Sequence, residues 1–254
     1  MVEVGWKITR GPVPASGPTT SNLVARYNAS NLTTIGTKVA VWDDLVGAHD
    51  LTLLGLPINA PIVDTSGTFP FVHFAQANPA SPVVQILSHA SLTLGACTLI
   101  AAFRPTAHYD RFVWCHGDAP QANPGAGLRT RSMIVEYSRD PGSGLQVIQR
   151  VGRTLPTAVD AQPWLIVAFV SDGTTNGTFV TVNGAFLPTR VSAPPALPPG
   201  SASVPTSFNV GGRGDQDAAF HFEGDIHEIL VYNAVLSHTD LALNTTYLKN
   251  VLGL

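Results

Sequence analysis

Short segments rich in turn-forming residues recur along this chain at regular intervals. "DTSG", "NPGAG", "DPGSG" and "SDGTTNG" separate runs such as "KVAVWDDL", "RFVWCHG", "RSMIVEYS" and "PWLIVAFVS". These runs either alternate apolar and polar residues or are rich in β-branched and aromatic residues. About a dozen such runs, with almost no helical periodicity, are typical of an all-β fold. The pattern therefore predicts an antiparallel β-sandwich of the jelly-roll type.

Two segments depart from the period of two. The stretch "SNLVARYNASN" (21–31) predicts one or two helical turns, with Ser21 or Asn22 as the cap. In "LSHTDLALNTTYLKNVLGL", Ser237 is followed three residues later by Asp240, which is a capping-box pattern. Gly253 is suited to the C-cap. We expect one terminal helix over about 238–252, packed on the strands.

The first 20 residues differ in composition from the rest. "GPVPASGPTT" is too rich in Pro, Gly, Ser and Thr for a regular element. Trp6 and Ile8 precede it, and apolar residues in an extended arm gain free energy by docking. We therefore expect 1–20 to form an arm that reaches another subunit, and 21–254 to form one domain. The alternative is that Trp6 and Ile8 pack back on their own domain.

Charge is sparse and limits the partners. Charged residues make up 12% of the chain, the net charge is −3, and no basic cluster occurs, which argues against a nucleic-acid partner. No apolar run is long enough to span a membrane, and the N-terminus lacks the apolar core of a signal peptide. Either other subunits of a homo-oligomer cover part of the surface, or Ser, Thr, Asn and Gly solvate it. We expect the protein in a virion, or in the bacterial cytosol before assembly.

Several segments, taken in order, resemble the laminin-G-like domains of the concanavalin A-like lectin/glucanase superfamily. The segments are "LVARYNASNL", "VAVWDDLVGAHDLTL", "PFVHFAQ", "WLIVAFVSDGTTNGTFVTVNGAFL", "FNVGGR" and "FEGDIHEILVYNAVLS". The resemblance covers roughly 21–254 and implies a jelly roll closed by a helix. Two positions depart from the family pattern: Val46-Gly47 replaces a Ser-Gly, and Ala75 replaces the Asp of "F-D-G". The calcium or sugar roles of acids in those loops are therefore not implied here.

Three acids stand close together in "HFEGDIHEILVY", at a spacing similar to that of glucanases with catalytic carboxylates on one strand. Strict alternation places Glu223 and Asp225 on one face and Glu228 on the other. A retaining glycosidase needs carboxyls about 5–5.5 Å apart, which would require a β-bulge between Asp225 and Glu228. We therefore expect no enzyme, with a glycoside hydrolase as the lesser alternative.

Glu228 falls on the more apolar face of its strand, so its carboxylate needs partners. We expect a buried acid, satisfied by backbone N–H groups or by an arginine such as Arg26. Cys97 and Cys115 lie on consecutive strand candidates. Two buried thiols are favoured over a cross-strand disulfide because no secretion signal is present.

Residues in or beside loops are the candidate ligand contacts: Tyr109, Asp118, Tyr137, Arg139, Arg213, Asp215 and Asp217. The Arg-Gly-Asp in "GGRGDQD" is read as a chance match. The three aspartates of this set offer oxygen ligands for Ca²⁺, although a solvated loop explains them equally well. No other cofactor is expected.

Two functions stay open. The missing signal, the arm and the low charge favour a non-enzymatic structural or binding module of a virion. Such a phage decoration or tail-associated protein would contact other capsid or tail subunits and cell-surface glycans. The alternative is a free bacterial lectin-like domain that binds carbohydrate.

Overall fold

The computed structural model describes 17–75, 85–106, 111–117, 125–131, 134–140, 147–152, 163–172, 178–186, 190–191, 206–216 and 220–254. Predicted features outside these ranges are named below without a structural account. They include most of the arm, with Trp6 and Ile8.

Strands make up most of the molecule, so the all-β prediction is confirmed. The strands are β1 (Leu23–Ile35), β2 (Lys38–Asp44), β3 (Leu51–Leu54), β4 (Ile62–Asp64), β5 (Phe71–Phe74), β6 (Ile86–Leu92), β7 (Cys97–Pro105), β8 (Arg111–His116), β9 (Gly125–Arg131), β10 (Ile134–Asp140), β11 (Val147–Gly152), β12 (Leu165–Ser171), β13 (Thr178–Val182), β14 (Ala185–Phe186), β15 (Arg190–Val191), β16 (Thr206–Val210) and β17 (Gly224–Tyr232). One 3-10 turn, η1 (Pro57–Asn59), and one helix, α1 (His238–Leu252), complete the described elements.

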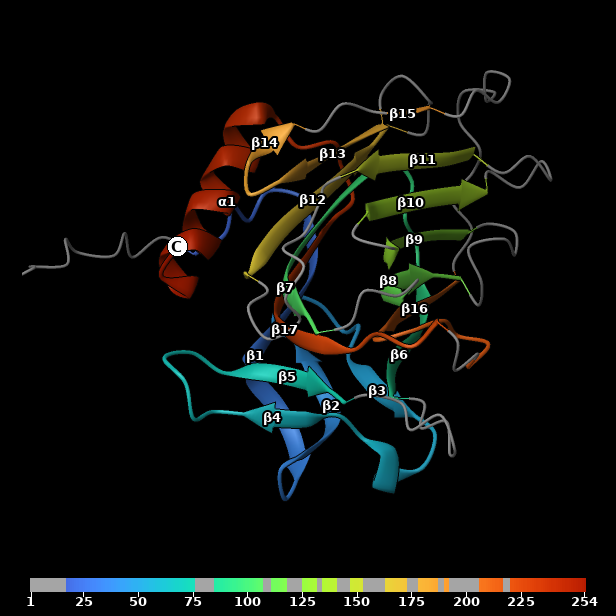
Figure 1. Cartoon of the computed structure of the whole chain (residues 1–254), viewed down its shortest axis with the longest axis vertical. Helices are drawn as coiled ribbons and strands as arrows, with labels where there is room; N and C mark the ends of the chain where they lie inside the picture. The colour runs from blue at the N-terminus through green and yellow to red at the C-terminus, as the bar shows by residue number, and fades with distance from the viewer. Residues whose placement is uncertain are drawn as a thin grey trace, which may run out of the picture.

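The strands form two facing layers joined by β1 (Figure 1). One layer runs β17–β7–β12–β13–β14, and the other runs β3–β6–β16–β8–β9–β10–β11. β1 pairs with β17 and also with β2, which continues to β3, so hydrogen bonding passes from one layer to the other. The pairings β1–β2–β4–β5–β17 close a ring. The result is one barrel-like sheet rather than two separate sheets.

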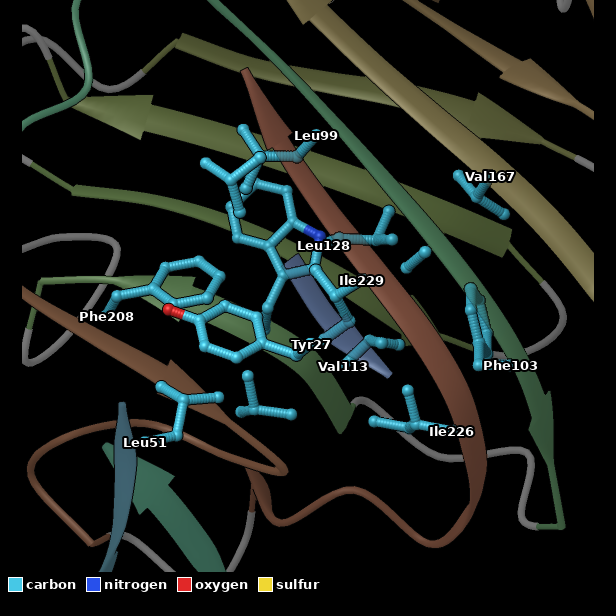
Figure 2. Packing of buried hydrophobic residues seen from close by; sticks show 14 of the residues in the cluster. Tyr27, Leu51, Leu99, Phe103, Val113, Leu128, Val167, Phe208, Ile226 and Ile229 are labelled. Atoms are coloured by element: carbon cyan, nitrogen blue, oxygen red, sulfur yellow. The ribbon is translucent and has the colours of Figure 1, made fainter. Parts of the chain in front are cut away.

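The main core lies between the layers. Its largest fully buried side chains include Trp42, Trp114, Tyr27 and Phe208. Figure 2 shows Tyr27, Phe208 and Ile229, which come from different strands, converging in this space. The apolar strand runs of the sequence predict Trp42 and Trp114 as core residues, whereas Tyr27 falls in a segment predicted as helical and Ile229 points inward only because of a register shift in β17.

A second apolar cluster lies on the outer side of β7, β12 and β17, where α1 packs. Leu241, Leu248 and Leu252 of α1 meet Ile100, Ile166 and Leu230 of the strands. The Ser237 hydroxyl accepts a bond from Asp240 N, and Gly253 adopts the left-handed conformation (φ 71°). The predicted helix and both of its caps are therefore confirmed.

The helical turn predicted over 21–31 is wrong, because this segment is part of β1. Ala25, Tyr27 and Ala29 are buried in the main core, a period-two pattern. Pairing with β17 on one side and β2 on the other satisfies the β1 backbone. Tertiary pairing thus outweighs the local capping signal of Ser21 and Asn22.

The end of the predicted arm lies on the body of the domain. Asn244 of α1 accepts from Thr19 N at 2.9 Å and donates to Thr19 Oγ1 at 3.0 Å. The Tyr232 hydroxyl donates to Thr19 O at 2.9 Å. Residues 17–20, which the sequence assigns to the arm, are thus held by β17 and α1. No helix among the described residues is long and apolar enough to cross a membrane.

Candidate functional site

A groove of about 310 Å³ lies between α1 and the hairpin formed by β13 and β14. In Figure 1, α1 runs beside these two strands at one side of the molecule. The volume is at the lower end of the range for small-molecule sites, about 300–1,000 Å³. The groove is lined by Thr181, Asn183, Gly184, Phe186, His238, Leu241, Ala242, Thr245, Thr246 and Lys249.

The hairpin wall of the groove is a tight turn. Asn183 (φ 53°) and Gly184 (φ 84°) both adopt positive φ, as a two-residue turn of the Asn-Gly type requires. Asn183 Oδ1 accepts from Ile166 N at 2.8 Å, and Asn183 N donates to Ile166 O at 2.7 Å. This wall is therefore fastened to β12.

The helix wall is one stripe of α1. The lining residues of α1 recur at intervals of three and one from His238 to Lys249, so they share one helix face. Eleven residues separate the two ends, which corresponds to about 16 Å along the helix axis. The groove is therefore long enough for an extended ligand.

Aromatic rings gather at the helix N-terminal end of the groove. The Phe186 ring lies 5.0 Å from His238 and 5.3 Å from Phe179, measured between centroids. Phe186 is 55% exposed, and His238 is also exposed. Because Thr181 is the cross-strand partner of Phe186, both side chains point to the α1 side of the hairpin. The site thus offers open aromatic surface next to polar groups.

The opposite end of the groove is cationic. Lys249 lies in the last turn of α1, and no ion pair involves it among the described residues. The lining set contains one Lys and one His and no Asp or Glu. This end can therefore attract a negatively charged group.

The three acids around β17 lie on different faces from those that strict alternation predicts, although Glu228 is buried and paired with Arg26 as expected. The pairing of β17 with β7 shifts between Ile226 and Glu228, so His227 occupies a β-bulge. Ile226 and Ile229 both point into the main core, and Asp225 and Glu228 therefore both point to the outer side. The predicted separation of Glu228 from Asp225 is wrong, because the bulge adds one residue and restores a common face.

Asp225 is a buried carboxylate between a histidine and an arginine on the two neighbouring strands. It lies opposite His73 of β5 and Arg104 of β7. His73 Nδ1 donates to Oδ1 at 2.7 Å, and Arg104 Nε donates to Oδ2 at 2.8 Å. The bond to Asp225 raises the pKa of His73. The Arg104 guanidinium also lies over the rings of Trp164 and Phe71, at 5.3 and 5.6 Å.

Glu228 is completely buried and has three side-chain donors. Arg26 Nε donates at 2.7 Å, Asn28 Nδ2 at 2.8 Å, and the Tyr247 hydroxyl at 3.0 Å. The partners come from β1 and α1, so this acid joins three elements. Burial and the nearby carboxylate raise the pKa of Tyr247.

Glu223 completes the set and is also buried. Arg111 Nη2 donates to its Oε1 at 3.1 Å. Each of the three carboxylates is thus at most 4% exposed and bonded to an arginine. A sugar ring needs open space beside a catalytic carboxylate, so the described packing supports a structural role for these three side chains.

Of the candidate ligand contacts drawn from the sequence, Arg213 and Asp215 have described side chains, and neither lines the groove. Tyr137 and Arg139 lie in β10, where Tyr137 is paired with Leu128 and Gln149, and their side chains are outside the described set. Arg213 forms an ion pair with Asp215 and lies over the Phe220 ring at 4.5 Å. The Arg-Gly-Asp segment is therefore folded on itself.

Three of the candidate residues, Tyr109, Asp118 and Asp217, lie outside the described residues. The calcium hypothesis needs two of them and stays a prediction. Within the described ranges, no three His, Cys, Asp or Glu side chains are grouped as metal ligands would be. Cys97 and Cys115 are buried thiols, as expected.

No family model and no curated protein matches the sequence. Solved structures do match the fold. Domain 4 of AbnA, a GH43 extracellular arabinanase of Geobacillus stearothermophilus solved with arabinotriose, has a TM-score of 0.59 and 16% identity over 89% of this chain and 98% of that chain. The sialidase of Trypanosoma rangeli, solved with 2,3-difluorosialic acid, has a TM-score of 0.58 and 13% identity over 91% of this chain and 33% of that one.

These matches correct the expectation that the chain is not an enzyme. The solved chains that share its fold include a sialidase, and a further match is a domain of an arabinanase. The chain spans about a third of the sialidase chains that it matches. The likeness establishes a fold that occurs in carbohydrate-active proteins. It gives no support to the expected virion role, and it is not specific to laminin-G-like domains.

Sequence reasoning missed the groove, although two signals pointed to its walls. The "VNG" turn predicts the hairpin that carries Phe186, and the capping box predicts the helix that begins at His238. What the sequence does not show is that these two elements, about 50 residues apart, lie side by side.

Proposed function

We propose that this protein binds carbohydrate in the groove between the β13–β14 hairpin and α1. The observation that carries the proposal is the exposed Phe186 ring beside His238 at one end of the groove. Sugar rings have apolar faces that pack on aromatic rings, while their hydroxyls need polar partners. A largely preformed groove with aromatic and polar lining fits such a ligand. The fold shared with an arabinanase domain solved with arabinotriose supports this reading.

Three polar side chains of the lining, Asn183, Thr246 and Lys249, can serve as hydrogen-bond partners for sugar hydroxyls. Phe186 supplies the apolar contact. Because Asn183 is anchored to Ile166, the turn does not have to be ordered on binding. Preorganisation lowers the entropic cost of association.

The laminin-G-like jelly roll is also part of the proposal. Its support is the position of two motifs: "VNG" forms the tight β13–β14 turn, and "GDIHEILVY" forms β17, which leads into α1. The arm, the assembly with capsid or tail subunits and the homo-oligomer stay predictions of the sequence.

A glycan array tests the function, with the full chain as the probe. Glycans that bind are then titrated calorimetrically against two variants. Phe186→Ala removes the aromatic contact, and the control Ile58→Ala removes an exposed apolar side chain on η1 that is not part of the groove lining. Loss of a buried phenyl contact of about 1.5–3 kcal/mol lowers affinity about 10- to 150-fold.

We expect Phe186→Tyr, which keeps the ring, to retain most of the affinity, and Ile58→Ala to bind as the parent does. An array without any binding glycan would contradict the proposal. Equal affinities of Phe186→Ala and Ile58→Ala for the same glycan would also contradict it.

A further inference from the structure

We propose that the groove is selective for acidic glycans, in which a sugar carboxylate lies next to Lys249. This inference rests on the proposed function and names the class of ligand. Its basis is the asymmetry of the lining: an aromatic end at Phe186 and a cationic end at Lys249.

The charge of the groove has one sign. Among the lining residues that the structure describes, Lys249 alone has a permanent charge and none is acidic. Asp240, the acid of the first turn of α1, is bonded to the Ser237 hydroxyl at 2.7 Å and is not part of the lining. A carboxylate entering the groove therefore meets a cation and no fixed anion.

Lys249 is available to a ligand. It makes no ion pair in the described part of the chain, unlike Arg26, Arg104 and Arg111, each of which holds a buried acid. It is partly exposed, and its flexible side chain can turn toward a ligand in the groove. Charge-assisted hydrogen bonds to a carboxylate are stronger than neutral ones, so an acidic sugar gains more here than a neutral sugar does.

The separation of the two ends predicts how the glycan lies. His238 and Lys249 are about 16 Å apart along the helix. One sugar cannot stack on Phe186 and reach Lys249 at the far end with its own carboxylate. The acidic unit is therefore a different unit of the glycan from the stacked one, and an oligosaccharide binds better than an acidic monosaccharide.

The test uses oligosaccharides in matched pairs: uronic-acid oligomers and the neutral hexose oligomers with the same linkage, which differ only at C6. Affinities are measured for the parent chain, Lys249→Gln, Lys249→Arg and the control Lys38→Gln, which removes a lysine at the β1–β2 end. We expect the acidic member of a pair to bind more tightly. Lys249→Gln should weaken acidic binding about tenfold, the effect of losing one charge-assisted contact.

Lys249→Arg should keep most of the acidic binding, Lys38→Gln should keep all of it, and added NaCl should weaken it. If neutral oligomers bind as well as acidic ones, and Phe186→Ala abolishes both, the proposed function holds and the acidic selectivity is refuted. If acidic oligomers bind unchanged to Lys249→Gln, the selectivity is refuted as well. If no oligomer of either kind binds, the proposed function and the selectivity both fail.

Discussion

Asp225 and Glu228 point to the same side of β17, although strict alternation would place them on opposite sides. His227 sits in a β-bulge between them, and Ile226 and Ile229 point together into the core. The bulge gives each acid its own arginine on the outer face: Arg104 for Asp225 and Arg26 for Glu228. Both carboxylates thereby fasten β17 to its neighbours.

Glu228 ties β17 to β1 and α1, so its loss should destabilise the domain. Glu228→Ala leaves Arg26, Asn28 and Tyr247 without their shared acceptor. We expect the free energy of unfolding to fall by about 2–3 kcal/mol, less than for a fully buried pair because Arg26 is partly hydrated. Urea unfolding measures this. Asp43→Ala, which removes one weak bond to Thr33, should change it by less than about 0.5 kcal/mol. An equal effect of the two substitutions would contradict the account.

The hydrogen bond between His73 and Asp225 can be tested by measuring the pKa of the His73 imidazole. Asp225 raises the pKa of His73 by hydrogen bonding and by its charge. The pKa of His73 is therefore higher in the folded protein than in the unfolded chain, where it is about 6.5. Protonated His73 stabilises the fold fully below this unfolded pKa, and the stabilisation is lost as pH rises through the folded pKa. In Asp225→Asn we expect the His73 pKa, followed by NMR, to fall. An unchanged pKa would show that the two side chains are not bonded in solution.

His221 should lower the stability of the fold at acid pH, whereas His73 raises it. Burial lowers its pKa to about 4, and its ring nitrogens lie near Gln85 N and Ala75 O. Because the folded pKa is depressed, stability is lost as pH falls from about 6.5 toward 4, at up to about 1.4 kcal/mol per pH unit. We expect urea midpoints to drop over this range and His221→Gln to flatten the drop. The same slope in both proteins would rule out His221 as the cause.

Two N-terminal truncations separate the arm from the body. Removing 1–16 leaves Thr19 in place, whereas removing 1–20 leaves the buried Asn244 and Tyr232 without their bonds to it. We expect the longer truncation alone to lower the free energy of unfolding, by about 1–3 kcal/mol. Equal stability of the two truncated chains would show that Thr19 contributes nothing.

The sequence predicts the strands better than their registers. Alternation and turn residues identify β17, and the capping residues Ser237 and Gly253 identify both ends of α1. The bulge at His227 is not visible in the alternation, because it depends on the fit between β17 and β7. The segment 21–31 was misread as helical because Ser21 and Asn22 give a local signal, whereas β17 and β2 supply the deciding contacts.

The candidate site was harder to predict than the fold. Candidates drawn from loops, such as Arg213 and Asp215, are paired with each other. The groove instead depends on how a hairpin and a helix from different parts of the chain meet. The "VNG" turn predicts the hairpin that carries Phe186 and the capping residues predict the helix that carries Lys249, but neither signal relates the two residues to each other. Only the fold brings them together, on two facing walls of the groove.

The most direct test of the account is the place where a glycan binds. Backbone amide shifts of the isotope-labelled protein are recorded as an array-selected glycan is added. The account predicts that the largest shifts fall on the β13–β14 hairpin around Phe186 and on the α1 stripe from His238 to Lys249. Shifts at the η1 end of the molecule around Ile58, with the groove unchanged, would contradict it.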